Sequence, residues 1–178
     1  MLFRSFAASL LAAALSAGAA YAQAPAPAAP SPLDVVPEKM PWNTPYGAPI
    51  SADKAEAAIK AAADESKKRG WQLNIAVVDS GGNLVAFLRM DGAQIGSIAI
   101  SEHKARVAVK YRRPTKVFED AIQKNDIKFI LTLDDIIASR GGIPLIEDGK
   151  IIGAVGCSGA TGSQDEVICQ AGAATINK

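Results

Sequence analysis

Two short polar turns, each set between apolar runs, constrain the fold of this chain more than any other feature of its sequence. Residues 79–83 (DSGGN) join the runs 71–78 and 84–90, and residues 147–150 (EDGK) join the runs 143–146 and 151–156. Asp, Gly and Asn are typical of tight turns because they tolerate the backbone angles that such turns need. Each pair of runs is therefore predicted to form a β-hairpin with antiparallel strands. This disfavours a doubly wound parallel sheet, whose strands need long crossovers.

Helix signals occupy most of the remaining chain. They predict helices over 51–69, 95–113, 115–124 and 164–174. Ser51 and Thr115 are the expected N-caps, while Gly70 and Pro114 end the first two helices. The pattern of residues 129–138 is compatible with either a helix or a strand. The order α-β-β-α-α-β-β-α predicts a single α+β domain in which helices cover an antiparallel sheet.

The N-terminus has the layout of a secretory signal peptide over residues 1–22. Arg4 gives a positive start, residues 6–20 are apolar, and Ala20-Tyr21-Ala22 predicts cleavage before Gln23. The apolar run is shorter than the roughly 20 residues of a membrane span. We expect a periplasmic or secreted protein with no membrane span after cleavage; an uncleaved anchor is the alternative.

The expected mature chain has room for one domain. Of 178 residues, 22 would be removed, leaving 156. Residues 23–45 are predicted to be a Pro/Ala-rich leader and arm, and 46–178 the domain. Trp42 and Tyr46 are expected to dock on the domain or on a neighbouring subunit. Since Arg4 leaves with the signal, 18 basic residues balance 18 acidic ones, and no nucleic-acid partner is expected.

Two cysteines, Cys157 and Cys169, lie in the predicted domain. An oxidising compartment permits a disulfide between them, which would stabilise the fold by about 3 kcal/mol in the chain-entropy model. Two buried thiols are the other possibility. Spacing alone does not decide between them.

Several polar residues interrupt the apolar pattern and are candidate site residues. They are Arg89 and Asp91 after the second strand, His103 and Lys104 in the second helix, Thr115 at a helix start, and Asp165 and Glu166 at the start of the last helix. Each also has a structural interpretation. Arg89 and Asp91 would form an ion pair, Lys104 and His103 would lie at the surface, and the two acids would complement the helix dipole.

Five short motifs together resemble the haem-binding HbpS/GlcG-like family over about residues 46–175. They are residues 75–86 with 89–93, Lys104-Ala105, 141–145 (GGIPL), 153–160 (GAVGCSGA) and 164–166 (QDE). The resemblance implies a profilin-like α+β domain that assembles as a homo-oligomer. It also implies haem binding, since some relatives are extracellular haem-binding and haem-degrading proteins linked to redox sensing. Others are encoded with metabolic operons or fused to a cobalamin adenosyltransferase.

The resemblance places the haem contact near the end of the second helix, at Lys104, Tyr111, Arg112 and Thr115. Thr115 matches a threonine implicated in haem coordination among relatives. The chain departs from the pattern in having one histidine, His103, so an N-terminal histidine ligand is lacking. His103, Thr115, Tyr111 or a partner subunit would supply the iron ligand. Lys104, Arg112 and Arg113 would hold propionates.

These observations predict a secreted, oligomeric binding protein for haem or a similar planar anionic molecule, possibly redox-linked. The alternative is a non-haem small-molecule-binding accessory protein of a periplasmic oxidoreductase. Its pocket would combine Arg89, Asp91 and Lys104 with the loop at 141–142. An enzyme that uses Lys104 and Asp165 as acid and base is a third reading, for which the sequence offers no orienting partner.

Overall fold

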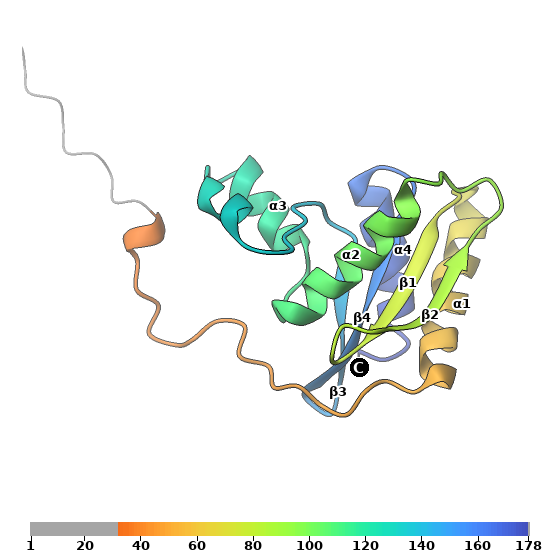
Figure 1. Cartoon of the computed structure of the whole chain (residues 1–178), viewed down its shortest axis with the longest axis horizontal. Coiled ribbons are helices and arrows are strands. Elements are labelled where there is room, and N and C mark those ends of the chain that lie inside the picture. The colour runs from red at the N-terminus through yellow and green to blue at the C-terminus, as the bar shows by residue number, and fades with distance from the viewer. Residues whose placement is uncertain (1–31, 178) are drawn as a thin grey trace, which may run out of the picture. The chain divides into compact units, whose positions relative to one another are not determined.

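A four-stranded antiparallel sheet forms the centre of the domain (Figure 1). The computed structural model describes residues 32–177, so the predicted signal peptide lies outside the described residues. The strands are β1 (Asn74–Asp79), β2 (Leu84–Arg89), β3 (Gly142–Glu147) and β4 (Lys150–Ser158), in the order β2-β1-β4-β3. Both predicted hairpins are confirmed, and β1 pairs with β4 to join them.

Four α-helices accompany the sheet. They are α1 (Ala52–Arg69), α2 (Ser97–Lys110), α3 (Lys116–Gln123) and α4 (Gly162–Ala173). The undecided stretch 129–138 contains the end of a short 3-10 helix, η2 (Lys128–Thr132), and then irregular chain. Another short turn, η1 (Pro32–Asp34), lies near the start of the described residues. The predicted α+β class is confirmed. Within residues 32–177 no helix combines the length and apolarity needed to cross a bilayer.

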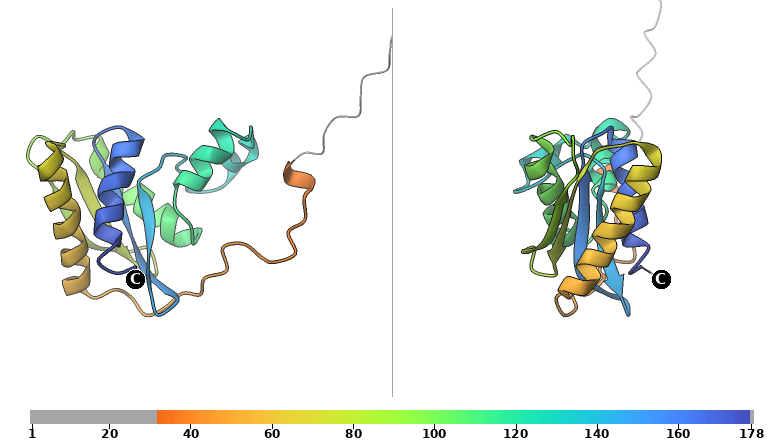
Figure 2. Two further views of the ribbon diagram at one scale, coloured as in Figure 1. Left: turned by 180° about the vertical axis from the view of Figure 1, so that it is seen from behind. Right: turned by 90° about the vertical axis from the view of Figure 1, so that its right-hand side faces the viewer.

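The helices cover both faces of the sheet (Figure 2). Helix α2 lies on one face, and α1 and α4 lie side by side on the other. Alternate residues of β1 serve the two faces, as a pleated strand requires. Ile75 and Val77 pack under α1 and α4, while Val78 packs with Ala105, Ala108 and other residues under α2.

Helix boundaries follow local capping signals in some places and not in others. The Ser51 side chain accepts a hydrogen bond from the Lys54 amide, and Gly70 ends α1 with φ of 69° in the left-handed region. Thr115 occupies the predicted N-cap position of α3, but its side chain makes no capping hydrogen bond there. Its hydroxyl instead accepts the Gly142 amide at 2.9 Å.

Helix α2 lies unusually close to the sheet because two glycines face it. Gly142 and Gly156 are cross-strand partners. A Cβ at Gly156 would lie 2.1 Å from the Ser101 carbonyl oxygen, and one at Gly142 would lie 2.3 Å from the Lys104 carbonyl oxygen. The helix backbone therefore rests directly on the strands, which buries the side chains that α2 turns toward the sheet.

The segment 45–50 fastens the N-terminal arm to the domain. The amide of Ile151 donates to the Pro45 carbonyl at 2.8 Å, and Gly47 donates to the Ile151 carbonyl at 2.8 Å. The Tyr46 hydroxyl lies 3.0 Å from the Val109 carbonyl oxygen and 2.9 Å from that of Lys110. The arm thus docks on the domain and contacts the C-terminal end of α2.

The two edges of the sheet differ. Strand β3 is covered at its outer edge, where Ile146 donates to Asn177 Oδ1 at 2.7 Å and Asn177 Nδ2 donates to the Pro144 carbonyl at 3.0 Å. Thr115 bonds both backbone groups of Gly142 at the start of the same strand. Strand β2 has no strand beyond it among the described residues.

Candidate functional site

A buried ion pair joins α2 to α4. Lys104 is 1% exposed and Asp165 is 2% exposed. Lys104 Nζ donates to Asp165 Oδ2 at 2.8 Å and to the Cys157 carbonyl at 3.2 Å, while Asp165 Oδ1 accepts the Ala160 amide at 3.0 Å. The interpretation of Lys104 as a surface residue is therefore wrong. The acid and the base that lacked partners in the sequence are partners of each other.

Residues 141–142 enclose this pair. Gly141 has φ of 110°, which only glycine adopts readily. A Cβ there would lie 2.9 Å from Asp165 Cβ and 3.2 Å from Lys104 Nζ. On the other side, the fully buried Thr115 accepts the Gly142 amide. Lys104, Thr115 and Asp165 thus form one closed cluster, here called the buried cluster.

Arg140 ties the covering loop to the helices beside it. Its Nε donates to Glu119 Oε1 at 2.7 Å, its backbone amide donates to Glu119 Oε2 at 2.8 Å, and its Nη1 reaches Glu166 Oε2 at 3.4 Å. The sequence predicted Glu166 but missed Arg140 and Glu119. No local spacing connects these two, because 21 positions separate them.

Burial and charge act in opposite directions on the carboxyl groups here. Burial raises the pKa of Asp165, and the charge and hydrogen bond of Lys104 offset only part of that effect. Burial also opposes ionisation of Glu119, but the hydrogen bonds and charge of Arg140 outweigh it and lower its pKa. Only the Lys104–Asp165 pair is closed to solvent, because the side chains of Arg140 and Glu119 are each 21% exposed.

A different group of residues lies on the outer side of α2. His103 Nε2 is 2.9 Å from the Asp135 carbonyl oxygen, and the Tyr111 hydroxyl donates to the Asp134 carbonyl at 2.7 Å. Lys110 forms an ion pair with the Asp135 carboxylate. These bonds hold the segment after η2 against α2.

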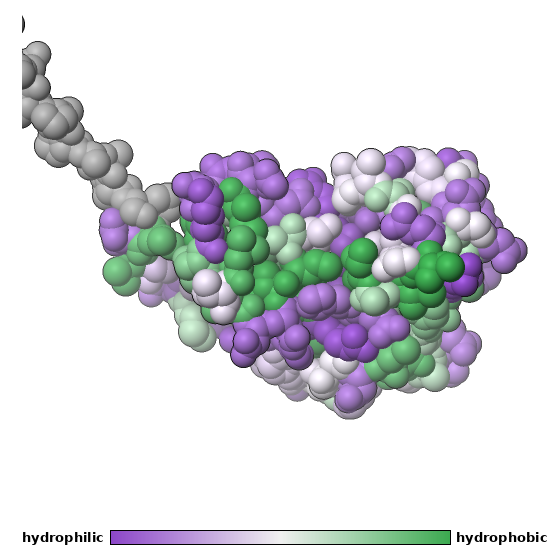
Figure 3. All heavy atoms as spheres, turned by 45° about the horizontal axis from the view of Figure 1, so that its top comes forward, coloured by the Kyte–Doolittle hydropathy of each residue, from purple (hydrophilic) through white to green (hydrophobic). Residues whose placement is uncertain are grey.

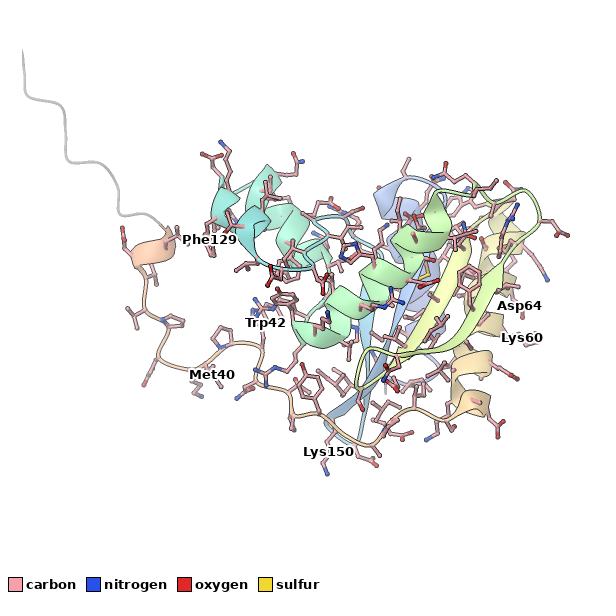
Figure 4. The ribbon with its side chains drawn as sticks, in the orientation of Figure 1. Met40, Trp42, Lys60, Asp64, Phe129 and Lys150 are labelled. Atoms are coloured by element: carbon pink, nitrogen blue, oxygen red, sulfur yellow. A yellow bond between two sulfur atoms is a disulfide. The ribbon has the colours of Figure 1, made fainter. Side chains whose placement is uncertain are left out.

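Exposed apolar side chains lie on α2 one turn from His103 and on the segment before Asp135, which its imidazole contacts. Ile100 lies one turn before His103 on the same side of α2, and η2 with the residue after it carries the others. The set, here called the outer apolar face, is Ile100, Phe129, Leu131 and Leu133. Figure 3 shows apolar residues in a band that begins over α3 and η2 and continues along α2. Phe129 is labelled in Figure 4.

Two arginines follow α2 and contact aromatic rings. Arg112 lies 5.9 Å from the Tyr46 ring centroid, and Arg113 lies 5.1 Å from that of Trp42. Figure 4 shows Trp42 beside the C-terminal end of α2. Arg112 has φ of 54°, a left-handed conformation that is uncommon outside glycine. Such conformations persist where the surroundings enforce them, often at functional sites.

Arg89 and Asp91 lie apart from the buried cluster. They line a cavity of about 430 Å³ with residues from the end of α1, and Lys104 does not contribute to it. Arg89 and Asp91 form no ion pair with each other, so neither the expected pair nor the expected shared pocket with Lys104 exists. The predicted site residues therefore fall into three places: the buried cluster, the outer side of α2, and this cavity.

No ready-made metal site is present in residues 32–177, where no three His, Cys, Asp or Glu side chains gather. His103 is the one imidazole of the chain. A haem iron needs only one or two protein ligands, so this composition fits haem better than a bare metal ion.

Cys157 and Cys169 form a disulfide that links β4 to α4, with Cα atoms 5.6 Å apart. Cys169 lies one turn after Asp165 on α4, and the Cys157 carbonyl accepts from Lys104. The covalent link and the buried ion pair thus both end on α4, the first from β4 and the second from α2.

Comparisons of sequence identify relatives over most of the domain. A family model described as haem degrading protein HbpS-like matches residues 50–174. Protein GlcG of Escherichia coli strain K12 is 41% identical over 109 residues, which is 61% of this chain and 81% of that protein.

Solved structures show the same fold. A double mutant of Streptomyces reticuli HbpS superposes with a TM-score of 0.68 and 27% identity, covering 88% of this chain and 100% of that one. A PduOC:heme complex superposes with a TM-score of 0.66 and 26% identity, covering 72% of this chain and 96% of that one.

Proposed function

This chain belongs to the haem degrading protein HbpS-like family, and on that premise we propose that it is an exported protein that binds haem or a similar planar anionic molecule. One solved relative is a complex with heme. Bound haem would supply redox chemistry at its iron, and the side chains of this domain would bind and orient it.

The outer side of α2 is the proposed binding surface. The observation that carries this choice is the half-buried imidazole of His103, which lies one turn from the exposed Ile100 on α2. An imidazole is a common ligand of haem iron, and exposed apolar side chains suit the faces of a porphyrin. Arg112 and Arg113 follow at the end of the same helix, where guanidinium groups would bind propionates through charge-assisted hydrogen bonds.

The buried cluster fits this role less well. Lys104 and Thr115 are almost entirely enclosed, whereas His103 and Tyr111 are half-buried and bond only backbone carbonyls of the segment after η2. We therefore assign Thr115 and Lys104 to holding the covering loop and α2 in place. His103, Tyr111 and Arg112 are the residues proposed to contact the ligand.

Titration of the exported protein with hemin tests this proposal. We expect a saturable Soret shift that His103→Ala weakens by about tenfold or more, since the iron loses its proposed ligand. Thr115→Val keeps the side-chain volume and serves as the matched test of the buried cluster, and it should leave the affinity unchanged. The proposal fails if no saturable shift occurs, or if Thr115→Val abolishes the shift while His103→Ala leaves it intact.

Export is proposed on two independent grounds. Residues 1–22 have the layout of a signal peptide, and the disulfide between Cys157 and Cys169 is of a kind that persists in oxidising compartments. Mass spectrometry of protein recovered from the periplasm or medium should give an N-terminus at Gln23 and no alkylated cysteine before reduction. Intact Met1 together with two free thiols would contradict export.

We also propose a homo-oligomer, because an apolar face of this kind is rarely left open to water. Light scattering on the purified protein should give a mass of at least two chains. Leu131→Glu, in the middle of the outer apolar face, should reduce that mass to one chain. A wild-type protein of monomer mass would contradict the proposal.

A further inference from the structure

We propose that the cavity beside Arg89 is a second ligand site, separate from the proposed haem surface, and that it takes a small aromatic carboxylate. The cavity lies between the end of α1 and the end of β2. Its lining is Lys67, Gly70, Trp71, Gln72, Leu88, Arg89, Met90 and Asp91. Its volume of about 430 Å³ is within the range of small-molecule sites.

The cavity brings together charged side chains that have no ion-pair partner among the described residues. Most lysines and arginines in residues 32–177 have a carboxylate within ion-pair distance, such as Lys60 with Asp64. Lys67 and Arg89 form no such pair among the described residues, although both line the cavity. The Asp91 carboxylate is likewise without an ion-pair partner there. Two cations against one anion leave the cavity positive, which favours an anionic ligand.

The indole of Trp71 provides a fixed aromatic wall. The Trp71 amide donates to the Ser66 carbonyl at 3.1 Å, and the buried Ser66 hydroxyl donates to the Trp71 carbonyl at 2.7 Å. The Arg69 guanidinium stacks 5.2 Å from the ring centroid. The hydrogen bonds fix the backbone of Trp71, and the half-buried indole packs against the main core, so little conformational entropy remains to be lost when a ligand binds.

The opposite wall is equally well positioned. The Met90 amide donates to the Leu73 carbonyl at 3.1 Å, which fixes the chain as it leaves β2. Leu88 and Met90 add apolar surface beside Arg89. A guanidinium binds a carboxylate through two parallel hydrogen bonds, and an aromatic ring fits beside the indole. Together these groups select a molecule with an aromatic ring and one carboxylate.

Fluorescence of Trp71 gives a direct readout. The chain has two tryptophans, so Trp42→Phe leaves Trp71 as the reporter. We expect benzoate to change its emission saturably. Benzamide keeps the ring without the charge, and acetate keeps the charge without the ring, so both should bind at least about fivefold more weakly.

Substitutions of the lining residues should change the affinity for benzoate in opposite directions, which a purely structural role of these residues would not produce. In the Trp42→Phe background, Arg89→Gln and Lys67→Gln should each weaken benzoate binding by about fivefold. Asp91→Asn should strengthen it, because a repulsive charge is removed. Lys150→Gln, which removes an exposed lysine outside the cavity lining, is the matched control and should change nothing.

Three results would overturn the proposal. They are a linear emission change without saturation, equal affinities for benzoate and benzamide, and weaker binding in Asp91→Asn. Each can be scored without hemin, so the haem proposal and this one succeed or fail separately.

Discussion

Lys104 and Asp165 show how a single pair of residues can connect two layers of a fold. Their charges lie between α2 and α4, out of contact with water, and each has hydrogen bonds beyond the ion pair itself. Removing one partner of such a pair leaves a buried charge without compensation. Replacing both partners by apolar groups of similar size leaves no such charge. The pair therefore makes the domain sensitive to single substitutions.

Lys104→Met should lower the free energy of unfolding by about 3–5 kcal/mol, because Asp165 remains buried without its cation. Adding Asp165→Leu should recover part of that loss. Urea denaturation of the two variants and the wild type measures both effects. Lys60→Met breaks the exposed pair with Asp64 and should change the midpoint little. A double variant less stable than Lys104→Met would contradict this account.

Adding a single Cβ atom at Gly156 tests how closely α2 packs on the sheet. Gly156→Ala would place a Cβ 2.1 Å from the Ser101 carbonyl oxygen, so the helix must move away from the sheet. We expect a loss of stability of about 1–3 kcal/mol or more, as in other overpacked cores. Gly96→Ala meets no atom within 4 Å and is the matched control. Equal thermal midpoints for the two variants would show that α2 is less closely packed than described.

At the scale of elements, the arm and α3 each depend on a few polar contacts. The arm reaches the last turn of α2 through Tyr46, and α3 surrounds Asp120 with cations. Neither contact involves the main core. Local changes at these elements should therefore alter local opening more than global folding.

Tyr46→Phe should release the end of α2, because the carbonyl oxygens of Val109 and Lys110 lose their hydroxyl donor. We expect faster hydrogen exchange at the amides of 111–113 and a loss of about 1 kcal/mol. Tyr111→Phe removes a hydroxyl that bonds the Asp134 carbonyl instead, so it should affect the segment after η2. Unchanged exchange at 111–113 in Tyr46→Phe would contradict the role of the arm.

The lowered pKa of Asp120 predicts that the free energy of unfolding depends on pH. Hydrogen bonds from Lys116 and then Lys124 lower its pKa from 3.8 to about 2. A carboxyl whose pKa falls on folding stabilises the fold above its unfolded pKa and loses that contribution as the pH falls through the folded value. The stability difference between wild type and Asp120→Asn should therefore be full above pH 3.8 and vanish toward pH 2. A difference that stays constant over that window in urea titrations would contradict this.

Local signals in the sequence are sufficient to predict the helices and strands, but not the contacts between them. The Ser51 cap and the Gly70 end bounded α1 correctly because both act within a few residues. Thr115 carried the same cap signal, yet its hydroxyl bonds Gly142 across 27 positions. Lys104 and Asp165 were both candidates, but 61 positions separate them, and no periodicity relates them. Arg89 and Lys104 lie in different places, because packing between elements decides which strand end faces which helix.

At the scale of the whole molecule, the disulfide ties α4 to the sheet through β4, and the buried ion pair ties the same helix to α2 across the sheet edge. Replacing Cys157 and Cys169 together by Ala should lower the free energy of unfolding by about 2–4 kcal/mol. Urea denaturation with and without reductant measures this, and reduced wild type should match the double variant. Equal midpoints for oxidised wild type and the variant would show that the link does not stabilise the fold.

The unequal edges of the sheet limit how copies of this domain can associate through their backbones. Asn177 and Thr115 occupy hydrogen-bonding groups along β3, so within residues 32–177 the sheet edge open to a foreign strand is that of β2. Two domains that met at β2 would use up the one open side of each. Such pairing stops at two domains. The continuous sheets of fibrous aggregates need a free edge on both sides of every subunit, so the native fold does not extend into one.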